Sequence, residues 1–111
     1  MRLPNQIDVS VSHWHIQDGE AVKTSSSPIA LAIVDALECP DLAVEVRPAL
    51  RLAFILAAGE LVAVYKLPRG VVRRIQRFDA ENFMRPFSFK ANRRRLPMHL
   101  EQEFLAHAPT P

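Results

Sequence analysis

The sequence predicts an α+β fold, with an antiparallel sheet of four to five strands and two helices in the order β-α-β-β-β-α-β. Three observations support this prediction. Several short segments alternate between apolar and polar residues, one helical segment is almost wholly apolar, and a second is apolar on one side and basic on the other. The 111 residues are 49% hydrophobic and 23% charged. We therefore predict a single domain over residues 1–111, with a frayed tail at about 108–111.

The first strand is predicted over residues 6–14, where Ile7, Val9 and Val11 alternate with polar residues. His13 and His15 follow, and two histidines at i and i+2 on a strand share one face, a geometry that could bind a metal. Because no Cys, Asp or Glu stands nearby in a ligand-like spacing, we predict polar residues at a strand end and no metal. Residues 17–27 have the composition of a loop.

A buried helix is predicted to begin at Pro28. Ser26 or Ser27 supplies a capping hydroxyl, and proline suits the first helical position. The helix ends near Pro40, because proline cannot continue it. Only two of its residues are clearly polar, so we predict that it packs across the sheet as the central core helix.

Three further strands are predicted at residues 42–46, 51–57 and 60–67. Residues 47–49 form a tight corner between the first two, and Ala58-Gly59 forms the turn of a hairpin. Together these segments predict an antiparallel meander that carries the buried helix on one face.

The second helix is predicted to begin at Leu67-Pro68 and to be amphipathic. At 100° per residue, Val71, Val72, Ile75 and Phe78 share one side. The opposite side is purely cationic and consists of Arg69, Arg73, Arg74 and Arg77. Like charges four residues apart repel each other, so this side is either a docking surface or an ordinary solvated basic face.

Residues 79–84 are predicted to be a turn or a fraying helix end, and residues 85–90 to form a strand with Phe87 and Phe89 on one face. Because Pro86 cannot donate a hydrogen bond to a neighbouring strand, we predict that this strand lies at the sheet edge. Residues 91–95 are predicted to be a basic loop, and residues 98–107 a short C-terminal helix with Leu100, Phe104 and His107 on one side.

Charge is distributed very unevenly along the chain. Residues 66–95 contain ten of the fourteen Lys and Arg residues and carry a net charge of +8, whereas residues 1–65 carry −4 and the tail −2. A guanidinium pairs bidentately with phosphate or carboxylate, and arginine dominates here. The predicted partner-binding residues are Arg69, Arg73, Arg74, Arg77, Arg85, Arg93, Arg94 and Arg95.

Several classes of function are disfavoured. The single cysteine, Cys39, excludes an internal disulfide and fits a reducing compartment. The N-terminus has no apolar signal core, and the longest apolar-rich run is interrupted by charges, so we predict a cytoplasmic protein without a membrane partner. With no glycine-rich phosphate loop, no zinc-type Cys/His spacing and no recognisable nucleophile–base set, we predict a protein that is not an enzyme and needs no cofactor.

Three short motifs carry a resemblance over roughly residues 7–90. They are His15-Ile16-Gln17-Asp18-Gly19, the helix start Ser27-Pro28-Ile29-Ala30-Leu31-Ala32, and Phe78-Asp79 followed by Pro86-Phe87-Ser88-Phe89. In these motifs the chain resembles small uncharacterised proteins of bacteriophages and prophages, many of which have a cysteine where this chain has Ser27. The resemblance implies an accessory protein of a mobile element, and some small phage proteins of this size inhibit host defences such as CRISPR.

Three functions are therefore considered. The protein could inhibit a host defence nucleoprotein complex by docking its arginine face, with Trp14, Phe87 or Phe89 as aromatic anchors. It could instead bind nucleic acid directly, with an affinity that falls steeply with salt. A third alternative is a homodimer formed through the exposed edge strand near Phe87 and Phe89.

Overall fold

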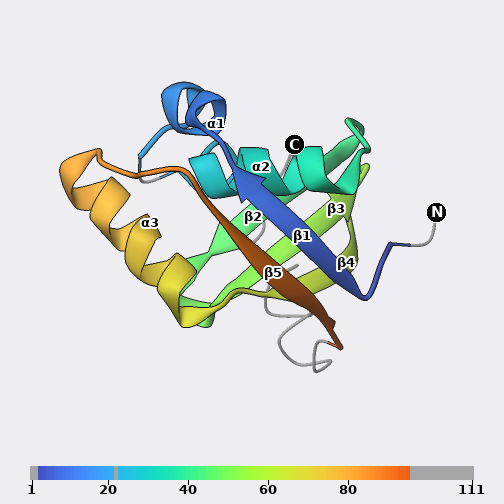
Figure 1. Ribbon diagram of the computed structural model, residues 1–111. Coiled ribbons are helices and arrows are strands. Elements are labelled where there is room, and N and C mark those ends of the chain that lie inside the picture. Colours follow the sequence, from blue (N-terminus) through green and yellow to red (C-terminus); the bar gives the residue numbers. More distant parts are fainter. Residues whose placement is uncertain (1–2, 22, 96–111) are drawn as a thin grey trace.

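The computed structural model describes residues 3–21 and 23–95 of the chain and shows a five-stranded antiparallel sheet with three α-helices (Figure 1). The elements are β1 (Gln6–Val11), α1 (His13–Asp18), α2 (Pro28–Leu37), β2 (Leu42–Arg47), the 3₁₀ turn η1 (Pro48–Leu50), β3 (Leu52–Ala57), β4 (Glu60–Lys66), α3 (Arg69–Glu81) and β5 (Phe87–Arg94). The predicted α+β class is confirmed. The predicted C-terminal helix at residues 98–107 lies outside the described residues.

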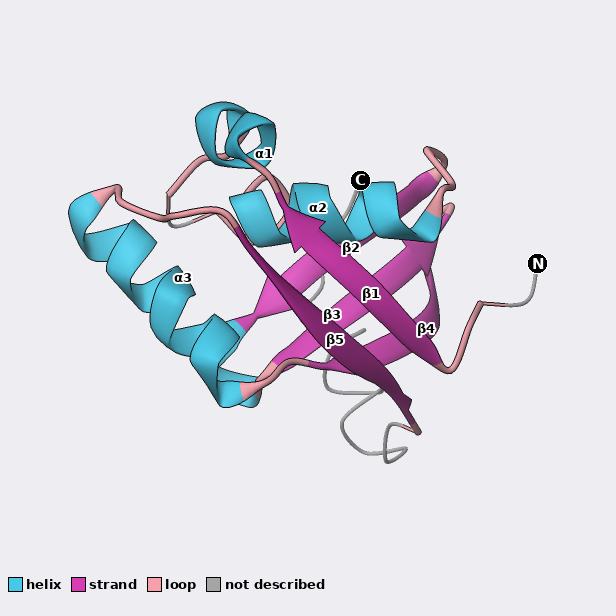
Figure 2. Ribbon diagram, viewed as in Figure 1, coloured by secondary structure: helices cyan, strands magenta, loops and turns pink. Residues whose placement is uncertain are grey.

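The sheet has the strand order β1-β5-β4-β3-β2 and is strongly curled. β5 pairs with β1 from Phe87 to Asn92, but with β4 only from Asn92 to Arg94. Figure 2 shows the β1–β5 pair crossing in front of β2, β3 and β4. α2 contacts both β1 and β2, the two edge strands, so this helix fills the space between the ends of the curled sheet.

β1 ends at Val11, and the residues predicted to extend it form α1 instead. Ser12 caps this helix: its backbone N–H donates to Nδ1 of His15 at 2.9 Å, while its hydroxyl accepts from the backbone N–H of His15. His13 and His15 are therefore helical neighbours rather than a pair on one face of a strand. Residues 3–21 and 23–95 hold no cluster of three or more side chains that could bind a metal.

α2 is the buried helix that its sequence predicts. Ser27 is 4% exposed and accepts a hydrogen bond from the Ala30 backbone N–H at 3.2 Å, so Ser27 rather than Ser26 is the cap. The apolar face of α2 includes Ile29 and Ile33, both fully buried.

The meander of β2, β3 and β4 is also as predicted, with Ala58 and Gly59 at positive φ in the hairpin turn. Tyr65 of β4 is fully buried and donates to the carbonyl of Pro4 at 2.6 Å. Burial raises the pKa of Tyr65, and the nearby Arg93 opposes this rise. The hydroxyl therefore stays protonated and ties the N-terminal segment to β4.

α3 buries Val71, Ile75 and Phe78 and leaves its basic side exposed, as its periodicity predicts. The prediction of an edge strand at residues 85–90 is wrong, because β5 lies between β1 and β4. Pro86 precedes β5, so its missing N–H removes no hydrogen bond from the sheet. β5 also continues through residues 91–94, which were predicted to be a loop, and the edge through which a dimer was predicted to form is paired with β1.

Candidate functional site

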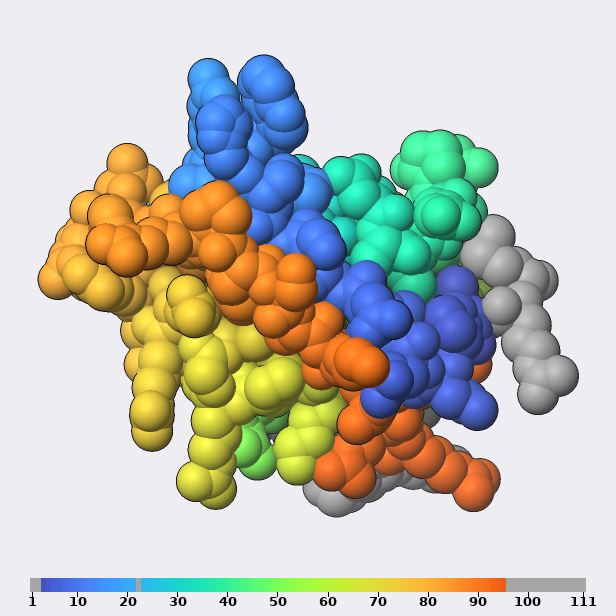
Figure 3. Space-filling model, viewed as in Figure 1, coloured from blue at the N-terminus to red at the C-terminus, as the bar shows by residue number. Residues whose placement is uncertain are grey.

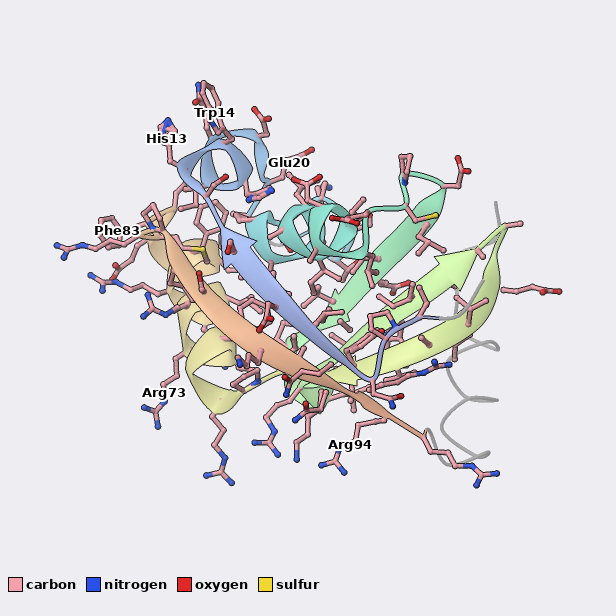
Figure 4. The ribbon with its side chains drawn as sticks, turned by 45° about the vertical axis from the view of Figure 1, so that its right-hand side comes forward. His13, Trp14, Glu20, Arg73, Phe83 and Arg94 are labelled. Atoms are coloured by element: carbon pink, nitrogen blue, oxygen red, sulfur yellow. The ribbon has the colours of Figure 1, made fainter. Side chains whose placement is uncertain are left out.

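Exposed and half-buried cations gather where the start of α3 meets the ends of β4 and β5. Two adjoining hollows share Arg51 as a lining residue. The larger, of about 420 Å³, has the charged residues Arg51, Lys66, Lys90, Arg93 and Arg94 in its lining, and the smaller, of about 280 Å³, is lined by Arg51, Arg69, Val72 and Arg73. We call Arg51, Lys66, Arg69, Arg73 and Arg94 the basic surface. Figure 3 shows long side chains from the start of α3 and the end of β5 projecting at the same edge, and Figure 4 shows Arg73 and Arg94 doing so.

Three separate chain segments build this surface. Arg51 follows η1 in the left-handed conformation, with φ 55°, and its carbonyl accepts from the Leu67 backbone N–H at 2.8 Å. That hydrogen bond holds the start of β3 beside the corner between β4 and α3. On the other side Lys66 is paired in register with Asn92 of β5, which places Arg94 next to it.

The cations of the basic surface raise each other's electrostatic energy. The pKa of Lys66 is lowered from 10.5, first by Arg94, then by Arg51, with smaller contributions from burial and from Arg69. No carboxylate among the described residues lines either hollow. An anion bound here would relieve this repulsion, so the surface is suited to phosphate or carboxylate groups.

Replacing Lys66 with glutamine is expected to raise the melting temperature at low salt and pH 7. A pKa that is lower in the folded protein means that the charge of Lys66 disfavours folding, and this cost falls only as the pH rises toward 10.5. The gain should disappear at about 1 M salt, which screens the repulsion. Lys90→Gln is the control. Nζ of Lys90 lies 3.8 Å from Oδ1 of Asp8, so this change removes an attraction and should not raise the melting temperature. An equal rise in melting temperature in both variants would show that the effect is not a local repulsion at Lys66.

The structure places the eight predicted arginines in different regions of the surface. Arg69, Arg73 and Arg94 belong to the basic surface, and Arg93 lines its larger hollow. The guanidinium of Arg93, however, donates to the carbonyls of Leu3 at 3.1 Å and Val62 at 3.3 Å, so it is a structural crosslink as well. Arg95 is exposed at the end of the described chain.

Arg74, Arg77 and Arg85 form a second group around aromatic rings. The guanidinium of Arg74 lies 4.3 Å from the Phe87 ring centre, and that of Arg77 lies 4.6 Å from the Phe83 ring centre. Together with Phe83 and Met84 these arginines line a third hollow of about 340 Å³, which we call the aromatic–arginine pocket.

Sequence reasoning missed Arg51 and Lys66 as site residues. Arg51 stands alone between apolar residues, outside the basic segment 66–95. Lys66 is the first residue of that segment, but it ends an apolar run and does not belong to the predicted basic side of the second helix. The available signal was the position of each at a strand end, next to a predicted corner, where polar side chains of different segments converge.

A trio at the other end of the molecule contains the groups of a serine-hydrolase triad. Nε2 of His15 lies 2.5 Å from Asp35 Oδ2, and its Nδ1 lies 3.0 Å from the Ser12 hydroxyl oxygen. However, Nδ1 already accepts the Ser12 backbone N–H, and the hydroxyl accepts the His15 backbone N–H. Since its lone pair is engaged, the imidazole is not placed to remove the Ser12 proton. We assign the trio to the capping of α1 and its attachment to α2.

Comparison with protein-family models, with curated proteins and with solved structures gave no match. Among the helices of residues 3–21 and 23–95, none combines the length and apolar character needed to cross a bilayer. The functional interpretation therefore depends on the residues of the site.

Proposed function

We propose that the protein is a non-enzymatic accessory binding protein that docks its basic surface on the nucleic acid of a host nucleoprotein complex. The observation that carries this proposal is the convergence of five cations from three chain segments with no carboxylate in the lining of either hollow. Clustered cations that repel each other cost folding energy, as the lowered pKa of Lys66 indicates, and a polyanionic partner offsets that cost.

The sequence resemblance to phage and prophage proteins supports a specific version of this proposal. In that version the bound complex belongs to a host defence, and docking inhibits it in the manner of an anti-CRISPR protein. If the basic surface covers the guide or the target nucleic acid, the complementary strand cannot pair with it.

A protein contact is a second candidate, and Trp14 favours it. This side chain is 68% exposed, and its ring packs edge-on against His13 at 5.0 Å between centroids. Exposed tryptophans are frequent hot spots of protein interfaces. Figure 4 shows Trp14 at the end of the molecule opposite Arg73 and Arg94, so a protein contact there would leave the basic surface available.

A salt titration tests the nucleic-acid contact. Binding of a fluorescent mixed-sequence oligonucleotide is measured by anisotropy between about 50 and 300 mM salt. If all five cations contact phosphates of a duplex, the logarithm of the affinity should fall with the logarithm of salt with a slope of about −4.5. Absence of binding at about 50 mM salt, or a slope near zero, would contradict the proposal.

A pull-down from host lysate, with and without nuclease, separates the two candidate contacts. Loss of the captured complex after nuclease treatment supports docking on nucleic acid. Capture that resists nuclease but is lost in Trp14→Ala supports the protein contact instead.

A further inference from the structure

Phe83 is an aromatic side chain whose position the hydrophobic core does not explain. It is 41% exposed, whereas Phe78, five residues earlier on α3, is 2% exposed. Phe83 directly follows Asn82, which ends α3 in the left-handed conformation with φ 53°. The left-handed residue ends the helix, and Figure 4 shows Phe83 at the edge of the molecule. The ring is thus presented to solvent by a defined helix end.

The surroundings of Phe83 are cationic. The Arg77 guanidinium lies 4.6 Å and that of Arg85 6.0 Å from the ring centre, and Arg74 completes the charged lining of the 340 Å³ aromatic–arginine pocket. Arg77 also donates to Glu81 at 3.1 Å, but both side chains are about 60% exposed, and such pairs are weak enough for a phosphate to compete. The pocket therefore combines a flat ring with charges that suit an anion.

This combination is typical of sites for single-stranded nucleic acid. Such sites stack an unpaired base on an aromatic or guanidinium face and hold the neighbouring phosphates with cations. In a duplex, by contrast, each base is already stacked on its neighbours and its face is not accessible.

α3 connects the aromatic–arginine pocket to the basic surface. Arg69, Arg73 and Arg77 follow one another at intervals of four residues, which corresponds to a rise of about 6 Å per step. The first two belong to the basic surface and the third lines the aromatic–arginine pocket. One extended strand could therefore contact both sites along the same side of α3.

We infer that the partner is single-stranded nucleic acid, with its phosphates along Arg69, Arg73 and Arg77 and one unpaired base in the aromatic–arginine pocket against Phe83. This inference rests on the proposed function and names the form of nucleic acid that it requires.

The test compares one labelled oligonucleotide as a single strand and as a duplex, with wild type, Phe83→Ala and Phe83→Tyr. We expect wild type to prefer the single strand, and Phe83→Ala to lose about tenfold in affinity for it while changing duplex affinity less than twofold. Phe83→Tyr keeps the ring and should restore single-strand binding. Val62→Ala, which trims another exposed hydrophobic side chain outside the lining of the three hollows, is the control and should leave both affinities unchanged.

Each other outcome is decisive. Equal affinities for both forms, with no effect of Phe83→Ala, would overturn the inference and leave docking of the basic surface on nucleic acid intact. Failure of wild type to bind either form would overturn the proposed nucleic-acid contact itself. A loss of affinity for labelled polyglutamate in Phe83→Ala as large as the loss for the single strand would show that the pocket takes acidic polypeptide rather than a base.

A tryptophan reporter gives an independent reading of stacking. In a Trp14→Phe background, Phe83→Trp places the sole tryptophan in the aromatic–arginine pocket. Addition of the single strand should quench its fluorescence if a base stacks there. Unchanged fluorescence under conditions where anisotropy reports binding would contradict the inference.

Discussion

Replacing both Arg73 and Arg94 with glutamate is expected to reduce the affinity for nucleic acid or nucleoprotein at least about 100-fold near 100 mM salt. Each change removes a cation that pairs with phosphate and places a like charge opposite the polyanion, and such juxtapositions cost several kcal/mol. The two residues come from α3 and β5 and line different hollows, so the double variant affects the whole basic surface. Anisotropy and inhibition assays should report the same loss.

The controls for this variant distinguish the effect of charge at the basic surface from the effect of net charge. Lys23→Glu changes the net charge as much as Arg94→Glu but lies in the exposed loop before α2. It should therefore weaken binding only slightly. A thermal melt should show that the double variant is at least as stable as wild type, since the Arg94 change relieves the largest repulsion on Lys66. If Lys23→Glu weakens binding as much as Arg94→Glu, the basic surface is not the interface.

Gly19→Ala is expected to destabilise the fold by about 2–3 kcal/mol. A Cβ atom at this position would lie 2.5 Å from Cδ, 2.6 Å from Cγ and 2.6 Å from N of Pro28. These atoms belong to a rigid ring and to the backbone at the start of α2, which the Ser27 cap holds in place. Gly19 has φ −75°, so the cost is steric and not a matter of backbone conformation.

Gly70→Ala provides the matched control for the glycine prediction. No atom lies within 4 Å of a Cβ at this position, and Gly70 is inside α3, where alanine favours the helix by up to about 1 kcal/mol. Urea unfolding followed by circular dichroism should thus show opposite signs for the two variants. Equal stability of Gly19→Ala and wild type would mean that α1 and α2 can move apart at little cost.

The glycine prediction also gives a physical reason for two motifs that carry the phage resemblance. His15 and Gly19 belong to the first motif, and Ser27 and Pro28 begin the second. In the structure His15 is part of the cap of α1, Gly19 packs on Pro28, and Ser27 caps α2. These motif residues therefore specify the α1–α2 junction, whereas Arg73 and Arg94 of the basic surface lie at the other end of the molecule (Figure 4).

Most elements could be predicted because their signals are local. Alternation defines β1 and β2, the apolar runs on either side of Ala58-Gly59 define the hairpin of β3 and β4, and the Ser27-Pro28 step defines the start of α2. α1 was missed because its capping box uses the His15 ring where glutamate or glutamine is usual. The position of β5 in the sheet could not be predicted from a local pattern, because it depends on pairing with β1, which is distant in sequence.

The candidate site could be predicted only in part, for a similar reason. Helical periodicity correctly put Arg69 and Arg73 on one exposed side. It could not distinguish them from Arg74, which stacks on Phe87 of a different element. Nor could it add Arg51, which reaches the basic surface through a left-handed turn and a hydrogen bond to Leu67.

The position of β5 between β1 and β4 also determines the order in which the protein can be completed. Gln6 of β1 bonds to Asn92 of β5 across 86 residues, so this pairing closes one of the longest loops in the chain. During synthesis β1 and β4 emerge first and keep unpaired edges until β5, the last strand of the part of the chain that the structure describes, inserts between them. Contacts of such long range slow folding and expose strand edges to association. Because β5 also contributes Arg94, the basic surface is complete only after β5 inserts, and a nascent chain lacking β5 would not display all of it.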